Sequence, residues 1–217
     1  MFRWPQFDAF AAWLLNANII KFVPMLLAVC WLWFERTSKR VINRPILVES
    51  VLISIAALII GRGLALALPF RDRPFLRPEL HFVTPLESVL RSWSSFPSDH
   101  AMLAFALAAS LFRISPRIGL WAFFHATILI CLPRLYFGLH YPSDLIGGAL
   151  ISVALVFVAS QLQVRHVVTN FFLRVECKHA GMFYVTGFFV FYNIGEMFLS
   201  ARVLANYTFH VLRQLVA

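Results

Sequence analysis

The sequence has few charged residues, and this scarcity excludes most soluble proteins. Asp, Glu, Lys and Arg make up only 13% of the 217 residues, whereas hydrophobic residues make up 60%. Soluble domains carry about 25% charged residues. Apolar runs of about 20 residues are typical of membrane-spanning helices. The composition therefore predicts an all-α fold, a polytopic bundle of membrane helices.

Cysteine and carboxylates are also scarce. The three cysteines stand far apart with no Cys-x-x-Cys pair, so the sequence supports neither a disulfide framework nor a zinc site. The ten Asp and Glu leave few ligands for a metal ion, and we expect no cofactor. The N-terminus lacks a basic region followed by an apolar stretch and a cleavage site, so we expect no removable signal peptide.

The chain does contain long apolar segments, and six of them are predicted to span the membrane. A short interfacial helix is expected before the first span, and the loop 163–179 is expected at the membrane interface. No low-complexity segment or separate soluble domain is visible, so 1–217 is predicted to be one membrane domain. The predicted spans are about 18–34, 45–68, 97–112, 118–131, 142–162 and 180–199.

Arginine provides most of the positive charge, with 16 Arg, 3 Lys and a formal net charge of +9. The basic residues are scattered between apolar spans, so we expect no nucleic-acid partner. Loops after spans 1, 3 and 5 carry four, two and three Arg or Lys, which predicts a cytoplasmic location for them. The outward segment 70–95 carries arginine against this rule, which indicates an anionic partner: Arg71, Arg73, Arg77 and Arg91.

The stretch His140-Tyr141-Pro142-Ser143-Asp144 predicts a helix start with a polar site. Proline favours the first turn of a helix, which puts Asp144 in that turn and His140 just before it. A carboxylate four residues on can orient the imidazole and make its other nitrogen more nucleophilic. Arg134 lies six residues upstream of His140, and its planar guanidinium suits a phosphate or a carboxylate.

The stretch Phe96-Pro97-Ser98-Asp99-His100 predicts a second helix start on the same outer face. Free backbone N–H groups and the Ser98 hydroxyl form an anion site there, and His100 can protonate a leaving oxygen. Arg62 lies in the last two turns of the second span. Taken singly, such residues have ordinary structural roles, but their convergence at one membrane depth favours phosphoryl transfer to a histidine.

These residues resemble the motifs of the type 2 phosphatidic acid phosphatases, or lipid phosphate phosphatases, which are related in fold to vanadium haloperoxidases. The family shows Lys-x6-Arg-Pro, Pro-Ser-Gly-His and Ser-Arg-x5-His-x3-Asp. The resemblance covers about 60–160, the expected catalytic core. The matching residues here are Arg73-Pro74, Pro97-Ser98-Asp99-His100, and Pro133-Arg134 with His140 and Asp144.

The resemblance implies a role for each matched residue. His140 would attack phosphorus and form a phosphohistidine, and Asp144 would orient it. His100 would protonate the leaving group and later help to activate water. The phosphoryl oxygens would be held by Arg73, Ser98 and Arg134. The family needs no metal ion, and its fold is a helical bundle, usually with six spans.

Three positions depart from the family pattern. Leu66 stands where the family has lysine, and Arg62 or Arg71 could supply the missing charge. Asp99 replaces glycine, which looks like the bacterial branch that dephosphorylates undecaprenyl pyrophosphate; the sequence assigns Asp99 no role of its own. Pro133 replaces serine and removes one contact.

The expected function is hydrolysis of a lipid phosphate or diphosphate, favouring a polyprenyl (undecaprenyl) diphosphate, by a multi-pass enzyme of the cell membrane with an outward-facing site. A phosphatidate-type phosphatase and a lipid phosphotransferase remain alternatives. A small transporter or lipid-binding protein is the alternative outside enzymes, with Glu49, Glu196 and His125 as polar sites. The partners expected are the lipid phosphate substrate and membrane lipid, and the oligomeric state stays open.

Overall fold

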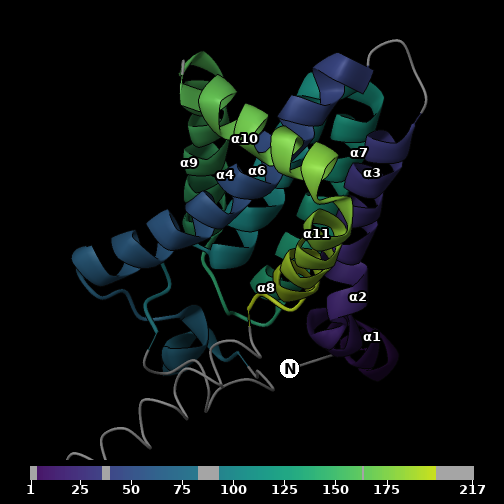
Figure 1. Ribbon diagram of the computed structural model, residues 1–217. Helices are drawn as coiled ribbons and strands as arrows, with labels where there is room; N and C mark the ends of the chain where they lie inside the picture. The colour runs from purple at the N-terminus through teal and green to yellow at the C-terminus, as the bar shows by residue number, and fades with distance from the viewer. Residues whose placement is uncertain (1–3, 36–39, 83–92, 163, 199–217) are drawn as a thin grey trace, which may run out of the picture.

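The computed structural model describes residues 4–35, 40–82, 93–162 and 164–198. Those residues form helices and contain no strand, which confirms the all-α prediction (Figure 1). Arg91, one of the outward arginines, lies outside the described residues. The helices are α1 (Pro5–Asn16), α2 (Asn18–Lys21), α3 (Val23–Phe34), α4 (Arg40–Ala67), η1 (Pro74–Leu76), η2 (Pro78–Leu80), α6 (Asp99–Ile114), α7 (Pro116–His125), η3 (Ala126–Cys131), α8 (Leu132–Tyr136), α9 (Pro142–Gln161), α10 (Val164–Lys178) and α11 (Ala180–Gly195).

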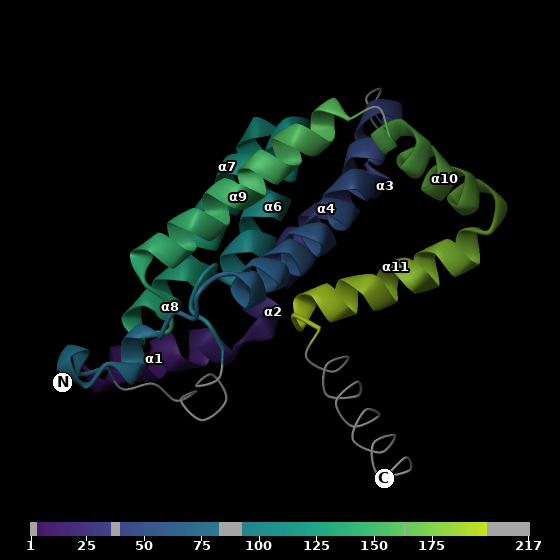
Figure 2. The same ribbon diagram turned by 90° about the vertical axis from the view of Figure 1, so that its left-hand side faces the viewer.

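Helix α6 forms the centre of the bundle and packs against α4, α7 and α9 (Figure 2). Small side chains such as Ala101, Ala104 and Ala108 are fully buried along it. Helices in lipid gain little from the hydrophobic effect and associate through close van der Waals packing, which small residues allow. The alanine-rich sequence of α6 therefore explains its central place.

The described residues contain helices along each of the six predicted spans, and the first of these spans is divided into α2 and α3. Three of them are long and apolar enough to cross a membrane, namely Val41–Ala67, Pro116–Tyr136 and Pro142–Gln161. Val23–Phe34 and Ala180–Gly195 are shorter apolar helices. The fourth span was predicted to end near 131, but helix continues to Tyr136. Proline is tolerated in the first turn of a helix. Pro133 therefore does not end the helix, and Arg134 lies on a helix rather than in a turn.

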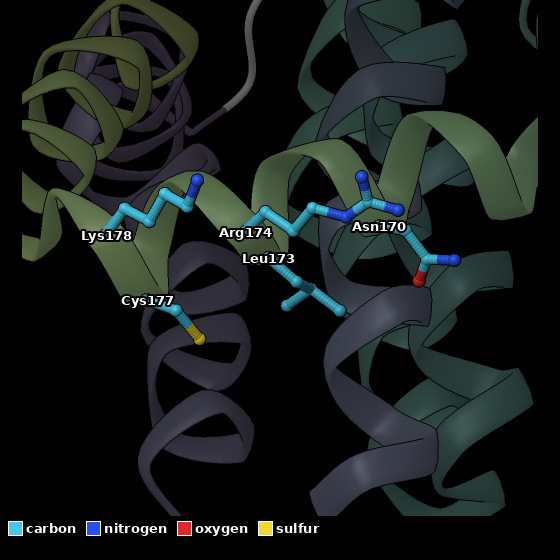
Figure 3. Close-up of a pocket in the computed structure, with 5 residues that line it drawn as sticks. All are labelled: Asn170, Leu173, Arg174, Cys177 and Lys178. Atoms are coloured by element: carbon cyan, nitrogen blue, oxygen red, sulfur yellow. The ribbon is translucent and has the colours of Figure 1, made fainter.

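The two ends of the bundle differ in structure. At one end the connections from α4 to α6 and from α8 to α9 come together beside α1 (Figure 2). At the other end α10 crosses α4 (Figure 1). A shallow hollow on α10 (Figure 3) is lined by Asn170, Leu173, Arg174, Cys177 and Lys178. This hollow lies far from the predicted catalytic residues, which all belong to the first end.

Candidate active site

The two helix starts singled out in the sequence lie side by side. The Ser98 backbone N–H donates to the Asp144 carbonyl over 3.3 Å. On α9, Gly148 approaches α6 so closely that a Cβ there would lie 3.1 Å from the Ser98 carbonyl oxygen. The absence of a side chain at Gly148 thus lets α6 and α9 begin together, and one site receives residues from both.

His140 is buried and held in one tautomer. Its Nδ1 lies 2.8 Å from the carbonyl oxygen of Ser95. A carbonyl can only accept a hydrogen bond, so Nδ1 carries the proton and Nε2 keeps its lone pair. An Nη1–H of Arg73 points at that lone pair from 3.3 Å. The nitrogen able to attack a phosphorus atom therefore faces a guanidinium that can hold the phosphoryl oxygens.

Burial sets the charge of His140. It lowers the pKa of the imidazole to about 4, and neighbouring Asp144, which acts in the opposite direction, only partly offsets this effect. The Arg73 and Arg134 cations lower the pKa of His140 as well. At neutral pH the ring is consequently uncharged, which is the state a nucleophile requires.

Asp144 is fully buried, and both of its carboxylate oxygens accept hydrogen bonds. Arg71 donates to Oδ1 over 2.6 Å. The Tyr141 backbone N–H donates to Oδ2 over 2.8 Å, and the Ser95 hydroxyl donates to the same oxygen. Oδ2 lies 3.7 Å from His140 Nδ1, beyond hydrogen-bond length. Asp144 therefore acts on His140 both by its charge and through Ser95.

Arg73 ties the connection between α4 and α6 to the connection between α8 and α9. Its Nε donates to the Trp93 carbonyl over 3.1 Å, and its Nη1 donates to the Leu139 carbonyl over 2.8 Å. Its Nη2 reaches the Ser94 carbonyl over 3.4 Å. Burial lowers the pKa of Arg73 to about 10, so the group stays cationic at neutral pH. Its hydrogen bonds go to neutral acceptors, and its charge remains available to an anion.

Arg134 and Ser98 add buried polar groups to the same end. Arg134 is 3% exposed, donates to the Ile130 carbonyl, and acts electrostatically on both His140 and Arg73. The Ser98 hydroxyl is fully buried and has no hydrogen-bond partner among the described residues. Buried polar atoms without a partner are uncommon. A ligand oxygen is a suitable acceptor for this hydroxyl.

Asp99 and Arg62 form a pair at the edge of the site. Arg62 Nη1 lies 3.3 Å from Asp99 Oδ2, and the guanidinium stacks 3.6 Å from the Trp93 ring centroid. This contact gives Asp99 the role that the sequence left open, since it serves as counter-ion to Arg62. Leu66 is 85% exposed, so its position points away from the site.

His100 occupies the first turn of α6 at the same end of the bundle. It is half-buried, and its ring stacks on Phe22 with centroids 6.0 Å apart. The structure thus joins Arg71, Arg73, Asp144 and His140 by direct contacts, pairs Arg62 with Asp99, and places His100 beside an N-terminal aromatic residue. Among the described residues, no group of three His, Cys, Asp or Glu could hold a metal ion.

Sequence reasoning missed Ser95 and Trp93. Ser95 supplies the carbonyl that fixes His140 and a hydroxyl to Asp144, and Trp93 contacts Arg62 and Arg73. The only available signal was their place directly before the Phe96-Pro97 helix start. Neither residue has a spacing that indicates its function.

Comparison with known proteins identifies this arrangement. The family model described as the PAP2 superfamily matches residues 47–167, a range that contains every predicted site residue. The chain belongs to the PAP2 superfamily. The resemblance seen in the motifs is therefore confirmed, and the chain is a membrane phosphatase of the PAP2 family, whose members hydrolyse phosphate esters.

Two relatives of this PAP2 protein differ in the function that their names state. The undecaprenyl-diphosphatase BcrC of Bacillus subtilis (strain 168) is 26% identical over 151 residues, 70% of this chain and 72% of that one. A protein of Bacillus licheniformis named bacitracin transport permease protein BcrC is 29% identical over 149 residues, 66% of this chain and 69% of that one.

A solved structure supports the PAP2 fold. It is the crystal structure of a transmembrane PAP2 type phosphatidylglycerolphosphate phosphatase from Bacillus subtilis. It superposes with a TM-score of 0.51 at 20% identity and covers 73% of this chain and 77% of that one. The two proteins share a fold, which agrees with a multi-pass membrane bundle.

Proposed function

We propose that this PAP2 phosphatase hydrolyses a lipid phosphate or diphosphate through a phosphohistidine on His140, with a polyprenyl diphosphate of the undecaprenyl type as the favoured substrate. The observation that carries the proposal is the contact between the His140 Nε2 lone pair and Arg73. A substrate phosphate would take over the Arg73 N–H and bring its phosphorus within reach of Nε2.

The first step forms a bond between Nε2 and phosphorus while the bond from phosphorus to the leaving oxygen breaks. His100 gives its proton to that oxygen. Arg73 and Arg134 stabilise the charge on the phosphoryl oxygens, and Ser98 donates a hydrogen bond. The Ser95 carbonyl and the Asp144 carboxylate stabilise the positive imidazole of the intermediate.

The second step releases inorganic phosphate. Water attacks phosphorus, the bond from phosphorus to Nε2 breaks, and neutral His100 accepts a proton from the water. This returns His140 to its neutral form and His100 to its protonated form. Every proton is accounted for by residues of this chain and by water.

Two considerations support the substrate class and the outward site. The names of related proteins include undecaprenyl-diphosphatase, and Asp99 fits the bacterial branch of the family. Basic residues of the loops at the α10 end follow the positive-inside rule, so we place the active site at the periplasmic or extracellular face of the cell membrane. Phosphatidate hydrolysis and phosphoryl transfer to a second lipid use the same residues and remain the alternatives.

A transport function has weaker support. Glu49 accepts a hydrogen bond from Arg113 over 2.8 Å, and His125 Nε2 bonds the Lys21 carbonyl over 3.0 Å. These partners explain the two intramembrane polar residues by packing and pairing. The name of the Bacillus licheniformis relative keeps transport as an outcome to be tested.

The test is phosphate release by the detergent-purified protein from a panel of lipids, with EDTA present. The panel contains an undecaprenyl diphosphate, a phosphatidate and a phosphatidylglycerol phosphate, each with and without an acceptor lipid. We expect the highest kcat/KM for the diphosphate and free phosphate as product. A labelled acceptor lipid would show a transferase, and inactivity of the whole panel would reject the phosphatase proposal.

A further inference from the structure

Lys21 stands outside every family motif, yet it lies next to the site. Helix α2, which Lys21 ends, packs against α1 and η3, and η3 leads directly into the helix of Arg134. The Lys21 carbonyl accepts a hydrogen bond from His125, and the next residue, Phe22, stacks on His100. These contacts hold the backbone of Lys21 near the first turn of α6 and near the segment that leads to Arg134.

The Lys21 ammonium is buried with little compensation. The residue is 4% exposed, and its Nζ donates to the Leu15 carbonyl over 2.9 Å. An ammonium has three N–H donors. Among the described residues, no carboxylate lies within ion-pair distance of Lys21 or of Arg134. Arg134 is close enough to act electrostatically on Lys21, so two buried basic side chains lie in the same region.

Two buried cations without a counter-ion oppose folding. Removing a charge from water is costly unless an opposite charge and further hydrogen bonds compensate. A bound anion would supply both to Lys21 and Arg134. The unpartnered, fully buried Ser98 hydroxyl at the start of α6 independently points to a missing oxygen ligand at this end of the bundle.

We propose that Lys21 is a phosphate-binding residue of the active site and supplies, from the N-terminal helix, the cation that the family pattern puts at Leu66. The proposal rests on the proposed function and adds a residue that lies outside the matched range 47–167. It also explains why leucine can stand at position 66, where the family has lysine. Because that position points away from the site, the charge has to come from another residue.

The experiment compares Lys21→Met, Lys21→Arg and the control Lys178→Met, which removes an exposed lysine at the α10 end. Inorganic phosphate serves as the probe, and its binding is measured from the rise in Tm that it causes. We expect Lys21→Met to weaken phosphate binding and to lower kcat/KM for lipid phosphate, each about tenfold or more. Lys21→Arg should keep most of both, and Lys178→Met should change neither.

Stability without phosphate separates a binding role from a structural one. Replacing an unpaired buried cation by an apolar side chain of similar volume is neutral or stabilising, so the Tm of Lys21→Met should be equal or higher. A lower Tm, a failure to fold, or an unchanged response to phosphate would overturn the proposal. Phosphate binding that depends on Lys21 in a protein inactive on every lipid would reject the proposed function and leave the anion site standing.

Discussion

The arginines at the two ends of the bundle have different kinds of partner. At the α10 end, Arg113 lies 2.8 Å from Glu49, and Arg44 lies 3.3 Å from Glu176. At the site end, Arg73 and Arg134 donate to backbone carbonyls, and neither has a carboxylate within ion-pair distance among the described residues. The two arginines at the α10 end are paired with glutamates, whereas Arg73 and Arg134 keep a positive charge that an anion can bind.

The site end is itself divided. Arg71 is paired with Asp144 and Arg62 with Asp99, so these arginines have internal counter-ions. The unneutralised charge belongs to Arg73, Arg134 and Lys21. Preorganised charge aimed at a developing anion is usually the largest contribution to catalysis. Substitutions should therefore rank in a fixed order: the nucleophile, the unpaired cations, the paired cations, and last the α10 end.

The largest effect is expected for His140→Ala, because it removes the nucleophile. Turnover should fall by about 10⁴-fold or more, and the wild-type protein, quenched during turnover, should carry a phosphoryl group that the variant lacks. The control is His179→Ala, which changes an exposed histidine at the opposite end and should leave turnover unchanged. Normal phosphate release by His140→Ala would reject the mechanism.

Arg73→Lys should lower kcat/KM by about 10²- to 10³-fold. The planar guanidinium reaches three carbonyls and His140 at once, and a lysine cannot reproduce that geometry. The matched variant Arg113→Lys changes an arginine that is paired with Glu49 at the opposite end and should alter Tm more than kcat/KM. Equal losses of activity in both variants would contradict the distinction between the two ends.

Asp144→Asn should move the acid limb of the pH profile of kcat/KM to lower pH. Burial lowers the pKa of His140 and Asp144 raises it, so removing the carboxylate lowers the pKa further below about 4. Activity requires neutral His140, so it falls as the pH drops through that pKa. A substrate phosphate also titrates near pH 6, but its ionisation is the same for both proteins, and the difference between the profiles isolates the enzyme. A limb that stays in place would show that Asp144 does not act on His140.

The helix starts and the site residues near them could be predicted because their information is local. Proline after an aromatic residue marks the start of α6 and of α9, and a four-residue spacing brings Asp144 within 3.7 Å of His140. The family resemblance then relied on the same short spacings. Local rules also explain why the predicted ends of α4 and α9 lie within a few residues of the observed ends, apart from the start of α4.

The remaining features depend on contacts between distant segments, which leave no periodic signal. Lys21 and Arg134 are 113 positions apart in the numbering, and only the packing of α2 against η3 brings them together. The outward direction of Leu66 follows from the face that α4 turns to α6, which depends on packing along the whole helix. Likewise, Ser95 acts through its backbone carbonyl, and every residue type has that group.

The smallest effect at the site end is expected for Arg62→Ala. The Arg62–Asp99 pair is partly exposed, with side-chain exposures of 36% and 18%, and such pairs contribute about 1 kcal/mol or less. We expect kcat/KM to fall by less than about fivefold, with partial recovery in the double variant Arg62→Ala/Asp99→Ala, which removes the carboxylate left without its partner. Arg71→Ala should cost more, since Arg71 bonds the buried Asp144 directly. A hundredfold loss in Arg62→Ala, larger than in Lys21→Met, would mean that Arg62 holds the phosphate. The family lysine would then have been replaced within α4 rather than from the N-terminal helix.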